Sequence, residues 1–93
     1  MKTKTRPKFP LTVDDLLELQ SRQIPIILEI HEECVIALLS ADTDFFAEGK
    51  TIQEAKESLL RGLTDEWKFL RKHEDELSEE LAAKYKLLKK LLV

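Results

Sequence analysis

The stretch EGKTIQEA, residues 48–55, marks the place where a sheet ends and a helix begins. Thr51 and Glu54 have the spacing of a capping box, in which each side chain satisfies a backbone N–H group at the start of a helix. Gly49 precedes the box, and glycine has the conformational freedom to let the chain turn off a strand. The stretch therefore predicts a strand that ends at residue 49 and a helix that follows Thr51.

One face of this predicted helix is apolar for five turns. Gly62 lies inside the helix, where it costs about 1 kcal/mol relative to alanine. We expect a neighbouring backbone to approach Gly62 closely, which would explain the glycine. The apolar residues lie three or four positions apart, as in a helix that covers a sheet; they are Ile52, Ala55, Leu59, Leu63, Trp67 and Leu70.

Three strands are predicted ahead of the helix. Residues 24–30 alternate in the period of a strand with one buried face, and Pro25 belongs at the start or on an edge of that strand. The apolar run 34–40 follows after a gap of a few residues, which an antiparallel pair can span. Residues 45–48 form a short third strand. We therefore expect an α+β fold, in which a three-stranded antiparallel meander is covered by the long helix as a βββα core.

The segments on either side of this core complete the predicted organisation. Residues 1–10 hold two prolines and four cations, and we expect a flexible basic arm. Thr12, followed by acidic residues, predicts a short capped helix over residues 13–21. The chain is thus divided into the arm, an α+β domain over residues 11–73 and a C-terminal amphipathic helix over residues 74–93.

The C-terminal helix begins with acids and ends with lysines, an arrangement that complements the helix dipole. Whether it continues the preceding helix through residues 73–75 stays open. A small domain has little core left for this helix to cover, so we expect its apolar face to contact a second chain, either in a homodimer or in a partner. The predicted interface consists of Leu77, Leu81, Tyr85, Leu88 and Leu92.

Charge is segregated along the 93 residues, whose net charge is −3. All eighteen acids lie between Asp14 and Glu80, with only seven lysines and arginines among them. Such an acidic body attracts basic partners, although an acidic surface also serves solubility alone. Both ends are basic, and the N-terminal cations are candidate contacts for nucleic-acid phosphates: Lys2, Lys4, Arg6 and Lys8.

The sequence offers no catalytic, cofactor or metal site. His31, Cys34 and His73 fall short of the four ligands of a structural zinc site. With two glycines, the chain has no glycine-rich phosphate loop. A possible Mg²⁺ cluster is better explained by turn-forming residues: Asp42, Asp44 and the nearby Glu48. We therefore expect a protein that is not an enzyme and carries no cofactor.

Cysteine content and hydropathy indicate a compartment. Cys34 is the single cysteine, so the chain has no intrachain disulfide. No apolar run approaches the ~20 residues of a membrane helix, and the basic start is not followed by the apolar region of a signal peptide. We expect a cytoplasmic protein without a membrane partner.

The order of elements from residue 24 to residue 67 resembles the HicB-like antitoxin family. The signature of that family is a strand pair followed by a glycine, a threonine and a Glu-Ala step that opens a helix; here these are Gly49, Thr51, Glu54 and Ala55. The resemblance implies part of a ribonuclease H fold without its catalytic carboxylates, over residues 11–73. It also implies that the protein neutralises a small basic toxin of the HicA type that cleaves mRNA.

Three functions follow from these observations. The first is an antitoxin or antitoxin-derived module that forms a homodimer through a sheet edge or its terminal helix and masks a basic toxin. The second is a stand-alone structural or scaffold protein that docks through the C-terminal helix. The third is a weak binder of nucleic acid through the basic tails.

Overall fold

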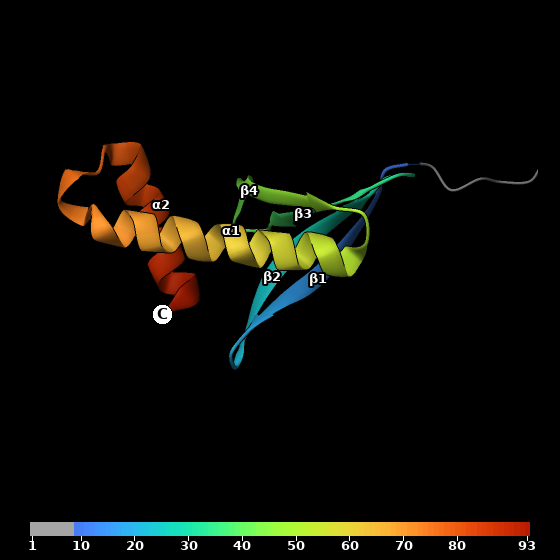
Figure 1. Cartoon of the computed structure of the whole chain (residues 1–93), viewed down its shortest axis with the longest axis horizontal. Helices are drawn as coiled ribbons and strands as arrows, with labels where there is room; N and C mark the ends of the chain where they lie inside the picture. The colour runs from blue at the N-terminus through green and yellow to red at the C-terminus, as the bar shows by residue number, and fades with distance from the viewer. Residues whose placement is uncertain (1–8) are drawn as a thin grey trace, which may run out of the picture.

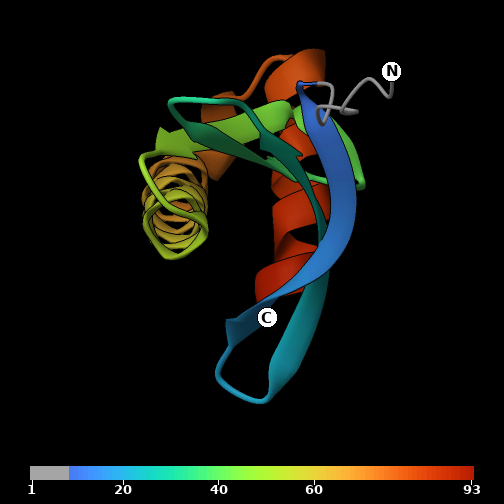
Figure 2. The same cartoon turned by 90° about the vertical axis from the view of Figure 1, so that its right-hand side faces the viewer.

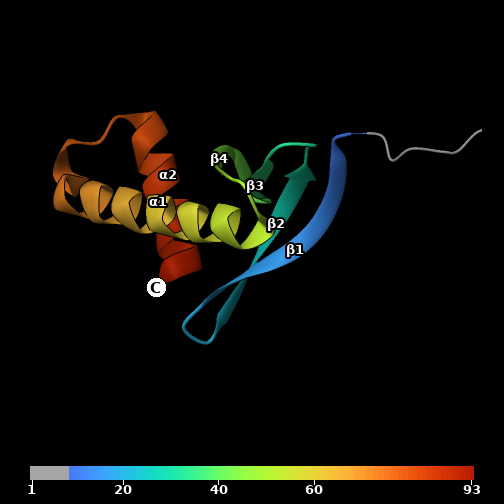
Figure 3. The same ribbon diagram turned by 45° about the vertical axis from the view of Figure 1, so that its right-hand side comes forward.

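The computed structural model describes residues 9–93, so residues 1–8 of the predicted arm lie outside the described part of the chain. The described residues confirm the α+β class, with a four-stranded antiparallel sheet in the order β1-β2-β3-β4 and two α-helices (Figures 1 and 3). The elements are β1 (Leu11–Leu19), β2 (Arg22–Ile30), β3 (Val35–Leu39), β4 (Asp42–Gly49), α1 (Ile52–Lys72), a short 3₁₀ turn (Glu74–Glu76) and α2 (Glu79–Leu92).

The short helix predicted over residues 13–21 is wrong, because this segment belongs to strand β1 and its turn. β1 pairs with β2 along nine residues, from Leu11 opposite Ile30 to Leu19 opposite Arg22. Gln20 has a positive φ of 56° and forms the connecting turn with Ser21. A helix of two turns has little stability of its own. In the strand, backbone N–H and C=O groups of the same segment form hydrogen bonds with β2 instead, and Leu17 is buried.

The predicted meander is confirmed as β2, β3 and β4, with one added strand at its edge. β4 begins at Asp42 instead of residue 45, and the pairing of β3 with β4 is irregular between Leu38 and Leu39. The Asp42 carboxylate accepts a hydrogen bond from the Asp44 N–H at 3.0 Å, which is the expected role of an aspartate in a turn.

The core lies between one face of the sheet and both helices. On β2, Ile24, Ile26 and Leu28 are buried, whereas Pro25 between them is exposed. α1 contributes four buried side chains and α2 contributes one. The complete buried set is Leu17, Ile24, Ile26, Leu28, Val35, Ala37, Leu39, Ala55, Leu59, Leu63, Leu70 and Leu88.

The capping box at the start of α1 is confirmed. The Glu54 N–H donates to Thr51 Oγ1 at 3.1 Å, and Glu54 Oε1 accepts from the Lys50 N–H at 2.9 Å. Gly49 is needed two residues before Thr51, because a Cβ atom at this position would overlap Ala55 N and lie 2.7 Å from Glu54 C. A side chain at residue 49 is thus incompatible with the tight connection from β4 to α1.

The expected reason for Gly62 is wrong. A Cβ atom at Gly62 would meet nothing within 4 Å, and the residue lies on the exposed side of α1. No packing contact in the described residues requires a glycine at this position.

The chain from residue 51 to residue 92 forms two helices. α1 ends at Lys72, and Ser78 caps α2 by accepting a hydrogen bond from the Leu81 N–H at 3.2 Å. α2 then crosses α1 (Figures 1 and 2), and Arg22 of β2 donates to the Lys90 carbonyl at 3.3 Å. The premise that little core remains for this helix to cover is wrong, because Leu88 belongs to the core and its neighbours pack against it.

The packing of α2 against the core is clearest at Leu88, because none of the surface of this side chain is exposed. Leu88→Ala is expected to lower the free energy of unfolding by about 2–5 kcal/mol, the usual cost of deleting a buried leucine side chain. The control Lys89→Ala changes an exposed neighbour and should stay within about 0.5 kcal/mol of the wild type. Urea unfolding followed by circular dichroism measures both, and equal stabilities would contradict the packing of α2.

The two glycines should respond in opposite directions to the same substitution. Gly62→Ala is expected to raise the free energy of unfolding by up to about 1 kcal/mol, because alanine is the better helix former and its methyl group has room. Gly49→Ala should lower it by about 1–3 kcal/mol, since the added methyl group overlaps the first turn of α1. Thermal and urea unfolding of the two variants provide the comparison, and a stabilised Gly49→Ala variant would contradict the tight connection.

Candidate functional site

The sheet has one face covered by helices and one face that no described element covers. α1 and α2 lie on the same side of the sheet (Figures 1 and 2). The opposite side, which we call the open face, is formed by the alternate residues of each strand. Its apolar members are Leu16, Pro25, Ile27, Ile36, Leu38 and Phe46.

An apolar row crosses the centre of the open face. Ile27 of β2 lies opposite Leu38 of β3, and Leu38 lies opposite Phe46 of β4. Phe46 is 63% exposed, more than any other large apolar residue in the described chain. Its neighbour Phe45 points to the helical side, where Lys84 Nζ of α2 lies 5.2 Å from the ring centre. The two phenylalanines thus have different roles, Phe45 in packing and Phe46 at the surface.

Acidic residues flank the apolar row. Asp14 of β1 lies opposite Ile27 and extends the row to the sheet edge. In the next row, Glu29 and Glu48 lie on either side of Ile36. No lysine or arginine occupies an open-face position of the four described strands: 12, 14, 16 and 18 of β1, 23, 25, 27 and 29 of β2, 36 and 38 of β3, and 46 and 48 of β4.

His31 and Cys34 lie at the end of β2 and at the start of β3, next to these acids. His31 Nε2 lies 3.1 Å from Glu29 Oε1. Partial burial raises the pKa of the Cys34 thiol, and the negative charge of Glu48 raises it further. The thiol is therefore kept in its neutral form, which is a poor nucleophile and a poor metal ligand.

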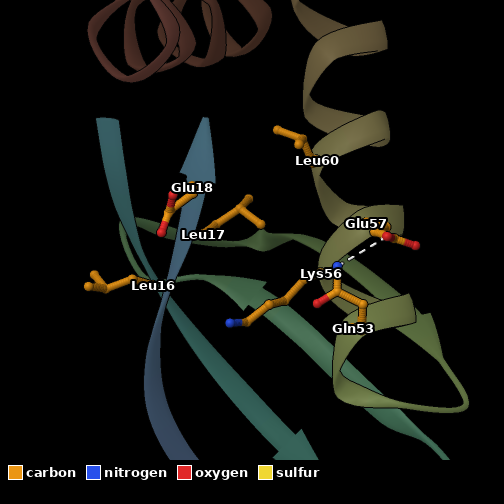
Figure 4. Close-up of a pocket in the computed structure, with 7 residues that line it drawn as sticks. All are labelled: Leu16, Leu17, Glu18, Gln53, Lys56, Glu57 and Leu60. Carbon is orange, nitrogen blue, oxygen red and sulfur yellow. Dashed lines mark hydrogen bonds between the residues drawn. The ribbon is translucent and has the colours of Figure 1, made fainter. Parts of the chain in front are cut away.

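A hollow lies between β1 and α1 (Figure 4). Lys56 points from α1 toward β1, and its Nζ lies 2.9 Å from Asp15 Oδ2, an ion pair that lowers the pKa of Asp15. The Gln53 side chain donates to Glu57 on the same helix at 3.1 Å. Lys56, the one cation among the described residues that line this hollow, is thus paired with Asp15 and joins the strand to the helix.

The residues predicted as an interface on the C-terminal helix are mainly used inside the chain. Leu88 is buried, and Leu77, Leu81 and Leu92 pack partly buried against the core. Tyr85 stacks on Trp67 with ring centres 5.2 Å apart, and its hydroxyl donates to Glu74 Oε2 at 2.7 Å, which raises its pKa. Lys2, Lys4, Arg6 and Lys8 lie outside the described residues.

The residues considered for metal binding are not brought together. His73 lies at the end of α1, where its ring contacts Phe69, far along the chain from His31 and Cys34. Between residues 9 and 93, no group of three or more histidine, cysteine, aspartate or glutamate side chains has the arrangement of a metal site. The same residues contain no helix that is both long and apolar enough to cross a membrane.

No family model matches this sequence, and comparisons with curated proteins and with solved structures give no match. The resemblance to the HicB-like antitoxins therefore remains a prediction from the residues.

Sequence reasoning missed the open face, although a signal for it was present. Residues 26–28 and 35–39 are continuous apolar runs, which are typical of strands covered on both faces. Residues 9–93 supply helices for one face only, so the second set of apolar residues stays at the surface of this part of the chain. A comparison of the number of helices with the number of apolar strand faces would have predicted that Ile27, Leu38 and Phe46 lie on an uncovered face.

Cys34 provides a chemical probe of this face. Glu48→Gln removes a negative charge beside the thiol, so the pKa of Cys34 should fall and alkylation by iodoacetamide at pH 8 should become faster. Glu57→Gln on α1 is the matched control and should leave the rate unchanged. The pH dependence of the alkylation rate measures the effect, and identical profiles for wild type and Glu48→Gln would contradict the arrangement.

Proposed function

We propose that this chain is a non-catalytic protein-binding module of the cytoplasm whose open face binds a small basic protein, as a HicB-type antitoxin binds its mRNA-cleaving toxin. The observation that carries the proposal is the apolar row of Ile27, Leu38 and Phe46, flanked by Asp14 and Glu48 with no cation among the open-face positions. Phe46 is exposed and Ile27 and Leu38 are partly exposed, and a continuous apolar surface with a polar rim is typical of interaction sites.

The two components of the face contribute differently to binding. Apolar side chains that leave water on binding supply affinity, and a central aromatic residue such as Phe46 commonly contributes the largest share. Carboxylates around it attract a cationic surface, which raises the association rate and disfavours acidic partners. A partner with apolar residues surrounded by lysines and arginines complements both features.

The shape and charge of the face favour a protein over other ligands. Small-molecule sites are concave and enclose most of the ligand, whereas an open sheet face offers breadth. The acids Asp14, Glu29 and Glu48 repel the phosphates of a nucleic acid. The second proposal is a scaffold protein that docks through its C-terminal helix. It has less support because Leu88 and much of the apolar face of α2 pack against the core of the same chain.

Phe46→Ser tests the open face, and Phe69→Ser is its matched control. Phe69 is 53% exposed but lies on α1, away from the sheet face. Both changes remove an exposed aromatic ring and should leave the fold intact. Phe46→Ser is expected to weaken binding by about 30-fold, corresponding to the ~2 kcal/mol of an interface hot spot, whereas Phe69→Ser should bind as the wild type does.

The partner for this measurement is the small basic protein encoded next to this gene, co-expressed with the chain and titrated by calorimetry at 50 and 300 mM salt. Affinity should fall as salt rises, because the acids of the open face contribute through charge. The absence of an adjacent gene for a small basic protein, or equal losses for Phe46→Ser and Phe69→Ser, would contradict the proposal.

A further inference from the structure

The sheet has two edges, and they differ in how they are protected. β4 lies at one edge, where α1 packs along it and the pairing with β3 is irregular. β1 lies at the other edge, and no described element lies beyond it (Figures 1 and 2). Natural edge strands are usually blunted by proline, charged side chains, a bulge or a cover. Over its nine residues β1 has no proline, lysine or bulge, and its three charged residues, Asp14, Asp15 and Glu18, leave the first three positions uncharged.

Hydrogen bonds of β2 show which backbone groups of β1 point outward. Ser40 N–H donates to the Pro25 carbonyl at 3.2 Å, and His31 N–H donates to the Cys34 carbonyl at 2.8 Å. The odd-numbered residues of β2 therefore bond toward β3, and its even-numbered residues bond toward β1. Because Val13 lies opposite Leu28, the odd-numbered residues of β1 bond toward β2. The even-numbered residues turn their N–H and C=O groups to the edge: Thr12, Asp14, Leu16 and Glu18.

Only part of this edge is closed by the chain itself. The Leu16 N–H donates to Asp15 Oδ1 at 2.7 Å, which occupies the outward donor in the middle of the strand. Thr12 and Asp14 direct their backbone groups outward at the N-terminal half. The N–H and C=O groups of these two residues could form hydrogen bonds with an added strand.

Exposed apolar side chains gather along the same half of β1. Of the eight large apolar residues exposed in residues 9–93, four lie between positions 9 and 16, which places half of them in less than a tenth of the described chain. Leu11 and Val13 are 40% and 45% exposed and lie on the helix-covered face, beyond the reach of the core. This concentration at an unpaired edge is the combination that favours addition of a strand.

We propose that the occupant of this edge is a second copy of the same chain, whose β1 pairs antiparallel with the first to join two sheets into one of eight strands. An edge that pairs with its own copy around a two-fold axis must match itself. Centring the axis on Thr12 brings Leu11 opposite the partner's Val13, and centring it on Val13 brings the two Val13 side chains together. With the axis on Thr12 the two Thr12 residues exchange hydrogen bonds, and with the axis on Val13 the Thr12 of each chain exchanges them with Asp14 of the other.

Charge selects these registers. A shift along the strand that centres the axis on Asp14 or Asp15 sets two like carboxylates opposite each other, which is destabilising. In the chosen registers the Asp15 carboxylate also keeps its ion pair with Lys56, at 2.9 Å. The pairing places the two open faces side by side on one continuous sheet, so a dimer would present two binding surfaces of the same kind.

Sedimentation equilibrium of the chain alone tests the dimer, independently of any basic partner. The wild type is expected to have twice the 10.8 kDa mass of one chain. Thr12→Pro removes an outward N–H without touching the bonds to β2, and it should reduce the mass to that of one chain. Glu18→Pro is the matched control, because it removes an outward N–H on the same strand but outside the pairing, and it should remain dimeric.

Val13→Lys is a second variant, which places a charge at the edge without a proline, and it should also be monomeric; circular dichroism verifies that each variant is folded. A monomeric wild type at several hundred micromolar would overturn the proposal. So would a dimer that survives both Thr12→Pro and Val13→Lys. Loss of binding in the Phe46→Ser experiment leaves this outcome unaffected, so the two proposals fail separately.

Cross-linking gives the register directly. In a Cys34→Ser background, either Thr12→Cys or Val13→Cys is expected to form a disulfide between two chains on mild oxidation, because paired strands bring equivalent Cα atoms within about 4.5–5.5 Å. Glu18→Cys should form none. Absence of cross-links from both Thr12→Cys and Val13→Cys, or efficient cross-linking of Glu18→Cys, would contradict the pairing.

Discussion

Leu88 of α2 lies buried against the same core as the α1 leucines, so both helices are committed to one face of the sheet. Arg22 reinforces this arrangement by donating to the carbonyls of Lys90 and Leu91 at the end of α2. With both helices used in this way, no described element remains for the opposite face. The surface position of Ile27, Leu38 and Phe46 is a consequence of where α2 packs, and the functional proposal depends on it.

Leaving these residues at the surface has a cost in folding free energy. Fully burying a large apolar side chain is worth about 1.5–3 kcal/mol, and this small sheet forgoes much of that gain for Phe46, which is 63% exposed. At 93 residues a domain has little stability to spare. In the two proposals, burial of the open face and of the β1 edge by other chains would recover this free energy. The charge pattern is the basis on which we propose a basic partner for the open face and a second copy of the chain for the edge.

Local sequence patterns predicted the elements whose causes are local. The alternation in residues 24–30 and the capping box of Thr51 and Glu54 require only neighbouring residues, and both predictions are confirmed. β1 was missed because Thr12 and the acids after it imitate a capped helix, while the pairing that makes it a strand comes from β2. The acidic body was visible in the composition. The placement of Asp14, Glu18, Glu29 and Glu48 on one sheet face depends on strand register, which no local pattern contains.

The central claim is that one face of the sheet is packed under helices while the other meets solvent. Methyl NMR relaxation with a soluble paramagnetic agent tests it on the isolated chain. The account predicts strong broadening for the methyl groups of Ile27, Ile36 and Leu38, and protection for those of Ile26 and Leu39 on the helical face. Equal protection of both sets would show that the open face is covered within the chain and would contradict the account.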